Sequence, residues 1–295
     1  MPEIRIGAGD LEVTVSTRFA AILACDWLVA GRRLPVLRPA GPEAAVTATA
    51  AGCFPLVPFG NRLAGNRFAF EDQEFRLAPN TADPCRLHGD GWLADWTVAA
   101  VSPRFVDLAL SVAASAASPY AYEAHQIVSV EADKIVVALS VTNRGRRLPF
   151  GLGLHGYFPL TAATTLLAPA AGYWLEGPGY LPTERAGLPD ELDFCRPKTL
   201  PERWINNGFE GWSGSAKIRW PERGFGVGIA ADALFGRYQL FRPDARFDPT
   251  GAGDWFCFEP MSHSPAAFRL PDLGGLVPLD RDQTLAGSIR FEILR

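Results

Sequence analysis

One histidine, His155, lies in the stretch 149–159, which is otherwise apolar, aromatic and rich in glycine. An imidazole titrates nearer neutral pH than other side chains, and glycine lets a backbone approach a ligand closely. Aromatic walls beside a single titratable group are typical of a small-ligand pocket. Taken by itself, the stretch is described equally well as a core strand that carries one buried, hydrogen-bonded histidine.

A carboxylate, Glu259, directly follows the aromatic strand candidate 255–258. Burying a carboxylate among apolar side chains is costly unless the group is paired or used, so this position suggests a tuned general base. The alternative is a strand-end carboxylate in a salt bridge. We expect His263 to lie in a loop outside the site, and His125 to be structural because residues 120–126 alternate as a strand.

Two earlier stretches, 58–63 and 87–92, collect polar and aromatic side chains among glycines. An arginine fork beside an amide can bind several hydroxyls or a carboxylate, and an indole offers a stacking face. The first stretch could instead be a surface loop with an ordinary ion pair, and the second a core tryptophan pair beside a turn. The candidates in them are Asn61, Arg62, His88 and Trp92.

Several function classes find no support in the sequence. The formal net charge is -4, and no basic patch suggests nucleic acid. The five cysteines are widely spaced without a C-x-x-C motif, so we expect neither zinc nor a disulfide framework. No nucleophile elbow, phosphate loop or dinucleotide fingerprint occurs, so no cofactor is implied.

The same sequence indicates a cytoplasmic protein that is not attached to a membrane. Free thiols fit a reducing compartment. Residues 1–16 alternate and carry charges, unlike the apolar core of a signal peptide. The longest uncharged run, 44–61, contains prolines and glycines and does not resemble a membrane span.

Strand patterns dominate the chain, and turn residues recur along its whole length. Residues 127–130 and 135–142 predict a hairpin, because Ile135, Val137 and Leu139 share one face at period two. Many short strands with frequent turns predict an all-β fold, an antiparallel sandwich or barrel, in one domain spanning 1–295 with few short helices. Residues 168–204, rich in proline, are expected to form long loops over one face. The other strand candidates are 12–16, 107–113, 216–220, 226–230, 238–241, 255–258 and 288–294, and residues 264–268 are expected to form one helical turn.

The ordered set of motifs resembles the aldose 1-epimerase (galactose mutarotase) family. Each motif is modest alone, and together they cover most of the chain from about residue 55 to 268. They are PFGNRLAGNRFAF at 58–70, LHGDGWLADW at 87–96, PFGLGLHGYF at 149–158, YLPT at 180–183, INNGFEGW at 205–212 and FEPMSHSPAAF at 258–268.

The resemblance implies a large antiparallel β-sandwich of the galactose mutarotase-like type, with a sugar cleft on one sheet face. It implies cofactor-free interconversion of the anomers of a free aldose, by a monomer or homodimer. His155 would be the general acid and Glu259 the general base, and we expect the carboxylate to raise the pKa of the histidine and keep it charged. Substrate-positioning residues would be Arg62, His88 and Asn61, with Trp92 or Tyr157 covering an apolar sugar face.

Two positions depart from the family pattern. Gly156 stands where a proline commonly follows the histidine, and Asn206 stands where an aspartate commonly grips sugar hydroxyls. A neutral amide forms weaker hydrogen bonds than a carboxylate, so we expect an altered sugar preference. Two other functions stay open: an epimerase of hexose 6-phosphates, with Arg32, Arg33 or Arg38 binding the phosphate, and a sugar sensor without catalysis.

Overall fold

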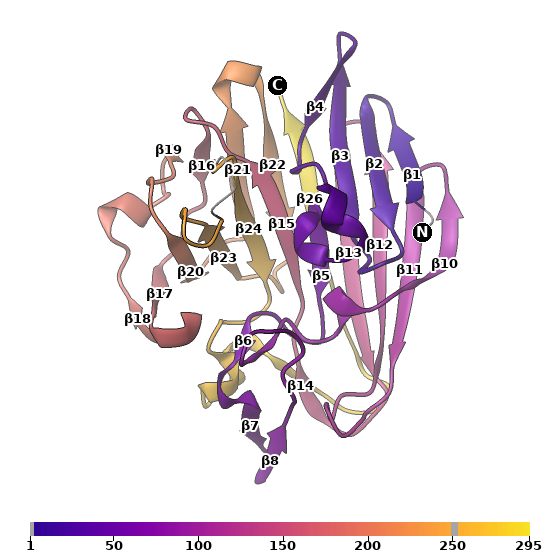
Figure 1. Ribbon diagram of the computed structural model, residues 1–295, viewed down its shortest axis with the longest axis vertical. Coiled ribbons are helices and arrows are strands. Elements are labelled where there is room, and N and C mark those ends of the chain that lie inside the picture. The colour runs from indigo at the N-terminus through magenta and orange to yellow at the C-terminus, as the bar shows by residue number, and fades with distance from the viewer. Residues whose placement is uncertain (1–2, 249–252) are drawn as a thin grey trace.

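The computed structural model of the protein describes residues 3–248 and 253–295. These residues fold into two large antiparallel sheets that lie face to face, together with three two-stranded ladders (Figure 1). The expected all-β sandwich is therefore confirmed.

The first sheet has eleven strands in the described part of the chain, and its central strands are β5, β15 and β24. In spatial order it contains β1 (Glu3–Ala8), β2 (Leu11–Ser16), β3 (Ile22–Val29), β5 (Cys53–Leu56), β15 (Gly153–Pro159), β24 (Trp255–Met261), β23 (Arg237–Arg242), β20 (Ile205–Glu210), β17 (Gly172–Glu176) and β18 (Pro182–Ala186), with β4 (Arg32–Pro35) paired to β3.

The second sheet packs behind the first, and nine strands form it among the described residues. Their order is β10 (Thr97–Ser102), β11 (Phe105–Val112), β12 (Tyr122–Glu131), β13 (Lys134–Asn143), β26 (Thr284–Leu294), β22 (Phe225–Ala231), β21 (Ser215–Trp220), β16 (Thr165–Leu167) and β19 (Lys198–Thr199). The predicted hairpin is confirmed as β12 and β13, whose register closes with Glu131 opposite Lys134.

The shorter elements connect and cover the sheets. The ladders are β6 (Arg62–Leu63) with β9 (Arg86–Leu87), β7 (Arg67–Phe70) with β8 (Gln73–Arg76), and β14 (Leu148–Phe150) with β25 (Val277–Leu279). The 3-10 helices are η1 (Pro42–Ala45), η2 (Ala48–Ala50), η3 (Ala64–Asn66), η4 (Gly91–Leu93), η5 (Pro178–Tyr180), η6 (Asp190–Leu192), η7 (Pro221–Arg223), η8 (Ala267–Arg269) and η9 (Leu273–Gly275). Among the described residues, no helix has the length and apolar character needed to cross a bilayer.

The other strand candidates fall in observed strands, although 107–113 runs one residue past the end of β11, and the expected turn at 264–268 is met in part by η8. The expectation of long loops at 168–204 is wrong. This region contributes β17 and β18, which extend the first sheet, and β19, which extends the second. Its prolines lie between or at the start of these short strands, where no ladder hydrogen bond is lost.

The central strand β15 separates two layers of buried side chains, because successive residues point to opposite faces. Leu154 and Phe158 belong to the main core between the sheets. Tyr157 belongs to a second buried cluster on the outward face, together with Phe54 from β5 and Trp92 from η4. This outward face of the first sheet carries the candidate functional site.

Candidate active site

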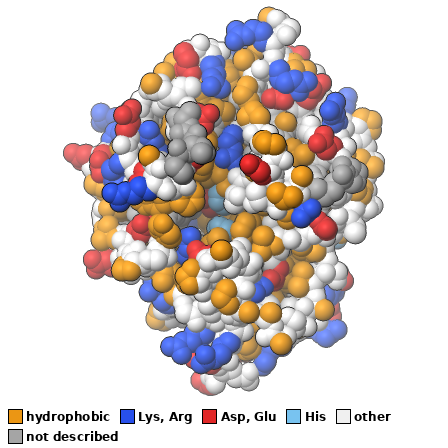
Figure 2. All heavy atoms as spheres, in the orientation of Figure 1, with side chains coloured by type: hydrophobic (Ala, Val, Ile, Leu, Met, Phe, Trp, Pro, Cys, Tyr) orange, Lys and Arg blue, Asp and Glu red, His pale blue; other side chains and the backbone are white. Residues whose placement is uncertain are grey.

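A cleft of about 690 Å³ opens on the outward face of the first sheet. Figure 2 shows this hollow near the middle of the molecule, with histidine side chains at its floor. Its volume falls within the range of about 300–1,000 Å³ typical of small-molecule sites. All eight residues singled out from the sequence line it: Asn61, Arg62, His88, Trp92, His155, Tyr157, Asn206 and Glu259.

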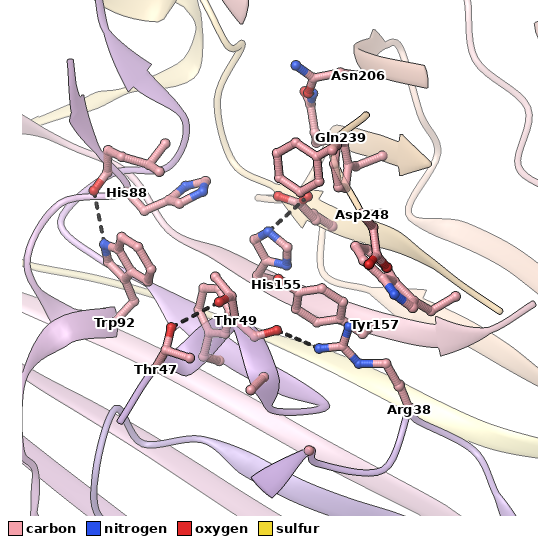
Figure 3. A pocket seen from close by; sticks show the side chains of 18 of the residues that line it. Arg38, Thr47, Thr49, His88, Trp92, His155, Tyr157, Asn206, Gln239 and Asp248 are labelled. Atoms are coloured by element: carbon pink, nitrogen blue, oxygen red, sulfur yellow. Dashed lines mark hydrogen bonds and ion pairs between the residues drawn. The ribbon is translucent and has the colours of Figure 1, made fainter. Parts of the chain in front are cut away.

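His155 and Glu259 face each other at the cleft floor. They lie on the adjacent strands β15 and β24, and Nε2 of His155 is 3.3 Å from Oε1 of Glu259 (Figure 3). The imidazole stacks on Phe54 at 4.6 Å and on Tyr157 at 4.8 Å between ring centroids. Both polar groups are buried, with exposed fractions of 8% and 3%. The stacking fixes the plane of the imidazole while leaving Nε2 directed at the carboxyl group.

Burial sets the charge state of this pair. It lowers the pKa of His155 from 6.5 to about 3, with a further contribution from the positive charge of Arg38. It raises the pKa of Glu259 from 4.5 to about 8, against the opposing effect of Arg62. Between these values the imidazole is neutral and the proton that the pair can exchange lies on the carboxyl group. The expectation that the carboxylate raises the pKa of His155 is therefore wrong, because desolvation outweighs the attraction between the two groups.

A short ladder brings the Arg62 and His88 motifs together. Arg62 in β6 pairs with Leu87 in β9, and the amide N–H of Asn61 donates to Nδ1 of His88 at 2.9 Å. Because Nδ1 accepts, Nε2 carries the proton of the neutral imidazole and can donate to a ligand. Burial, followed by the charges of His155, Arg62 and His263, lowers the pKa of His88 well below 6.5. His88 is thus a neutral hydrogen-bond donor at pH 7.

The turn after His88 depends on glycine at position 89. Gly89 has φ +67°, and a Cβ there would lie 2.4 Å from Cδ of Pro58 and 2.6 Å from the carbonyl oxygen of Val57. Only glycine fits this close approach without strain. This turn orients His88, whose ring lies edge to face with that of His155 at 5.5 Å between ring centroids.

The guanidinium of Arg62 is held by an ion pair and by an aromatic ring. Its Nε lies 2.8 Å from Oδ2 of Asp83, and both side chains are 15% exposed. The guanidinium carbon lies 5.0 Å from the ring centroid of Tyr180. Arg62 therefore enters the cleft with its orientation already set.

Tyr157 offers less of its ring to a ligand than expected. The guanidinium of Arg38 lies 3.9 Å from its ring centroid, and His155 stacks on it as well. Trp92 is fixed by donating from Nε1 to the carbonyl oxygen of Leu87 at 3.0 Å. Trp92 also stacks on Phe54 at 5.6 Å, and both aromatic residues expected to cover a sugar face are only 4% exposed.

The sequence interpretation missed several lining residues. Gln239 could have been found, because it is the polar residue in the apolar strand candidate 238–241, whereas Phe54 gave no signal in an apolar run. The sequence suggests only a phosphate-binding role for Arg38, which lines the cleft. Arg32 and Arg33 do not line it, and Arg33 pairs with Glu12 and Asp26 instead. The lining residues with no assigned role in the sequence include Phe54, Tyr180, Trp204, Gln239, Phe241 and Trp255.

The remaining sequence expectations concern histidines and the position after His155. His263 does not line the cleft, and its Nε2 accepts from the amide of Gly60 at 2.9 Å. His125 lies in β12 and bonds Asp107 at 2.9 Å. Gly156 is paired to strands on both sides, opposite Cys53 and Phe258.

One group of side chains could supply metal ligands. Ligand atoms of His155, Cys257 and Glu259 lie within 4.8 Å of one another, and Cys257 shares the outward face of β24 with Glu259. Burial raises the pKa of the Cys257 thiol well above 9.0, so the thiolate that binds metals is strongly disfavoured. The same geometry serves proton transfer between His155 and Glu259 without further change.

Comparison with known proteins assigns the chain to a family. The family described as aldose 1-epimerase matches residues 2–291. This chain belongs to the aldose 1-epimerase family. It is 44% identical over 262 residues to the uncharacterized protein YphB of Escherichia coli K12, covering 88% of this chain and 89% of that one.

Solved structures of the family share the fold. A crystal structure of a protein from Escherichia coli K12, provisionally named an aldose 1-epimerase, superposes with a TM-score of 0.93 at 39% identity, covering 99% of this chain and 98% of that one. A homologue of aldose epimerase from C. elegans superposes with a TM-score of 0.80 at 15% identity, covering 99% and 98%. At that identity the likeness concerns the fold alone.

Proposed function

We propose that the protein is a cofactor-independent aldose 1-epimerase, which interconverts the α and β anomers of a free aldohexose. The observation that carries the proposal is the facing pair His155 and Glu259, which holds one transferable proton at the floor of a sugar-sized cleft. Ring opening needs one acid and one base on the same sugar, and such a pair supplies both.

The reaction starts once the proton has passed from Glu259 to His155 across their 3.3 Å contact. Sugar hydroxyls that donate to the carboxylate favour this charged form. Glu259 then takes the proton of the C1 hydroxyl while His155 protonates the ring oxygen. The bond between C1 and the ring oxygen breaks, and an open-chain aldehyde with a free C5 hydroxyl results.

The ring recloses after rotation about the C1–C2 bond. The C5 hydroxyl attacks the other face of the aldehyde and returns its proton to His155, while Glu259 returns a proton to the C1 oxygen. The pair therefore ends with the single proton it began with. Arg62, Asn61 and the donor Nε2 of His88 would hold the sugar so that each oxygen meets the correct group.

Polarimetry of freshly dissolved α-glucose and α-galactose tests this proposal. His155→Ala and Glu259→Ala should each lower the catalysed rate by about 10²–10⁴-fold, the usual contribution of general acid–base catalysis. Equal rates for the wild type and both variants would reject the assignment. Calorimetric sugar titration of all three proteins separates lost catalysis from lost binding, and binding without anomerisation would indicate a sensor.

A second candidate, a hexose-6-phosphate 1-epimerase, is favoured by one observation. Arg38 lines the cleft and donates from Nη2 to the carbonyl oxygens of Thr49 and Ala51, contacts that leave its positive charge unneutralised. Glucose 6-phosphate compared with glucose discriminates the two functions. An advantage of the phosphate ester that disappears in Arg38→Gln would support this candidate.

A further inference from the structure

A carboxylate outside the cleft holds two of the side chains that line it. Glu176, at the end of β17, accepts from Nε1 of Trp204 at 3.0 Å and from Nδ2 of Asn206 at 2.5 Å. Trp204 and Asn206 line the cleft, whereas Glu176 lines a small adjoining void that Asn206 also borders. It can therefore influence a ligand only through the residues it holds.

The hydrogen bonds continue from Asn206 along the cleft wall. Oδ1 of Asn206 accepts from Nε2 of Gln239 at 2.8 Å, and Oε1 of Gln239 accepts from Nδ2 of Asn61 at 3.4 Å. Oδ1 of Asn61 accepts from the backbone N–H of Arg62 at 2.7 Å. Three amide side chains thus form one continuous chain, which we call the amide chain, and all three line the cleft (Figure 3 shows Asn206 and Gln239).

The two ends of the amide chain allow only one direction. An amide group can be turned by half a rotation, which exchanges its donor and its acceptor. An ionised carboxylate can only accept, and a backbone N–H can only donate. Because Glu176 stands at one end and the amide N–H of Arg62 at the other, reversing any amide between them would place two donors or two acceptors face to face.

This direction decides what a ligand meets. Each amide uses one N–H and one lone pair within the chain and keeps one of each for a ligand. Turning an amide by half a rotation would exchange the positions of its free N–H and its free lone pair on the cleft wall. Gln239 also lies opposite Glu259 in the ladder of β23 and β24, so the chain passes directly beside the proposed base.

We propose that Glu176 is a positioning residue that, together with the backbone N–H of Arg62 at the other end, sets the donor–acceptor direction of the amide chain and thereby determines which arrangement of sugar hydroxyls the cleft binds. The inference rests on the proposed function, since it concerns the sugar bound in that cleft. Glu176 touches no reacting atom and acts through Asn206.

Exchanging the carboxylate and the amide between positions 176 and 206 tests the role of the donor–acceptor direction. In Glu176→Gln an amide hydrogen must face Trp204 or Asn206, and in Asn206→Asp two carboxylates face each other. In the double variant Glu176→Gln/Asn206→Asp, the amide at position 176 donates to the carboxylate at 206, which still accepts from Gln239. Each single change should raise KM about 5–10-fold with kcat within about twofold, since the lost interaction is a charged hydrogen bond made before the reaction. The double variant restores the direction of the chain but lacks the free amide N–H of Asn206, so its KM should fall below that of either single variant without reaching the wild-type value.

The controls separate this role from a merely structural one. Glu184→Gln removes an exposed carboxylate on β18 and should leave KM unchanged. The ratio of KM for glucose to KM for galactose should change in each single variant and lie nearer to the wild-type ratio in the double variant. A double variant no better than the worse single variant would overturn the proposal.

The outcome can be told apart from failure of the proposed function. Calorimetric Kd values for the same four proteins apply even if the wild type binds sugar without anomerising it. If no sugar binds, the proposed function fails. The thermal unfolding midpoints of the four proteins then test whether Glu176 sets the direction of the amide chain. Midpoints lowered in both single variants and restored in the double variant would uphold it, and midpoints that fall additively would refute it.

Discussion

Replacing Glu259 with glutamine should stabilise the folded protein increasingly as the pH rises. The carboxyl group is 3% exposed, and burial raises its pKa from 4.5 to about 8. Above pH 4.5 the unfolded chain loses this proton while the folded chain retains it. The wild type therefore loses stability through this group as the pH rises from about 4.5 to about 8, whereas an amide of similar shape does not titrate.

The size of the effect follows from the shift in pKa. Each pH unit within the window changes the free energy of unfolding by about 1.4 kcal/mol. Between pH 5 and pH 8 the difference between variant and wild type should grow by about 4 kcal/mol in favour of Glu259→Gln. The buried histidines 88, 155 and 263 are present in both proteins, so their own pH dependence cancels in this difference.

Urea unfolding at pH 5, 6, 7 and 8 measures the difference, provided that both proteins have the same m value. Glu184→Gln, at an exposed carboxylate, serves as the control and should differ from the wild type by less than about 0.5 kcal/mol at every pH. A difference between Glu259→Gln and the wild type that stays constant from pH 5 to pH 8 would show that Glu259 ionises normally. The single-proton account of the site would then be wrong.

Three further predictions concern the charged residues of the site. The polarimetric kcat/KM should fall above about pH 8, where the pair loses its proton, and below about pH 3, where it gains a second; a rate that rises through pH 8 after subtraction of the buffer blank would contradict this. Arg38→Gln should move the acidic limb of that profile to higher pH, because the charge of Arg38 lowers the pKa of His155; an unmoved limb would show that this charge is screened. Asp83→Asn should raise KM about tenfold with kcat nearly unchanged, because it releases Arg62 from its ion pair; an equal fall in kcat would place Arg62 in the chemistry instead.

The strands and the residues that line the cleft could be predicted well from the sequence. Period-two alternation marks β12, β13 and the strands near the C-terminus, because one face of each is buried in the core. His155 and Glu259 stood out because a titratable side chain in an apolar run is rare. The β17 and β18 strands were missed, since five residues between prolines are too few for a periodic signal.

The charge states and the relations between distant residues could not be predicted. The pKa of His155 depends on how completely Phe54, Tyr157 and the strands bury it, which no local pattern records. Glu176 gave no signal, because its importance arises only when β17 brings it to Asn206. Arg38 stood out as a cation, but nothing nearby in the sequence indicated that it would lie over Tyr157.

The pairing of β15 with β24 joins segments from the middle and the end of the chain, and neither His155 nor Glu259 has its partner until that pairing forms. Contacts between such distant segments close large loops and are slow to form during folding. Regain of enzymatic activity after dilution from denaturant should therefore lag behind regain of strand content. The proposed activity is in this way a reporter of the pairing between β15 and β24, and a nascent chain that has not yet released β24 from the ribosome lacks the facing pair His155 and Glu259.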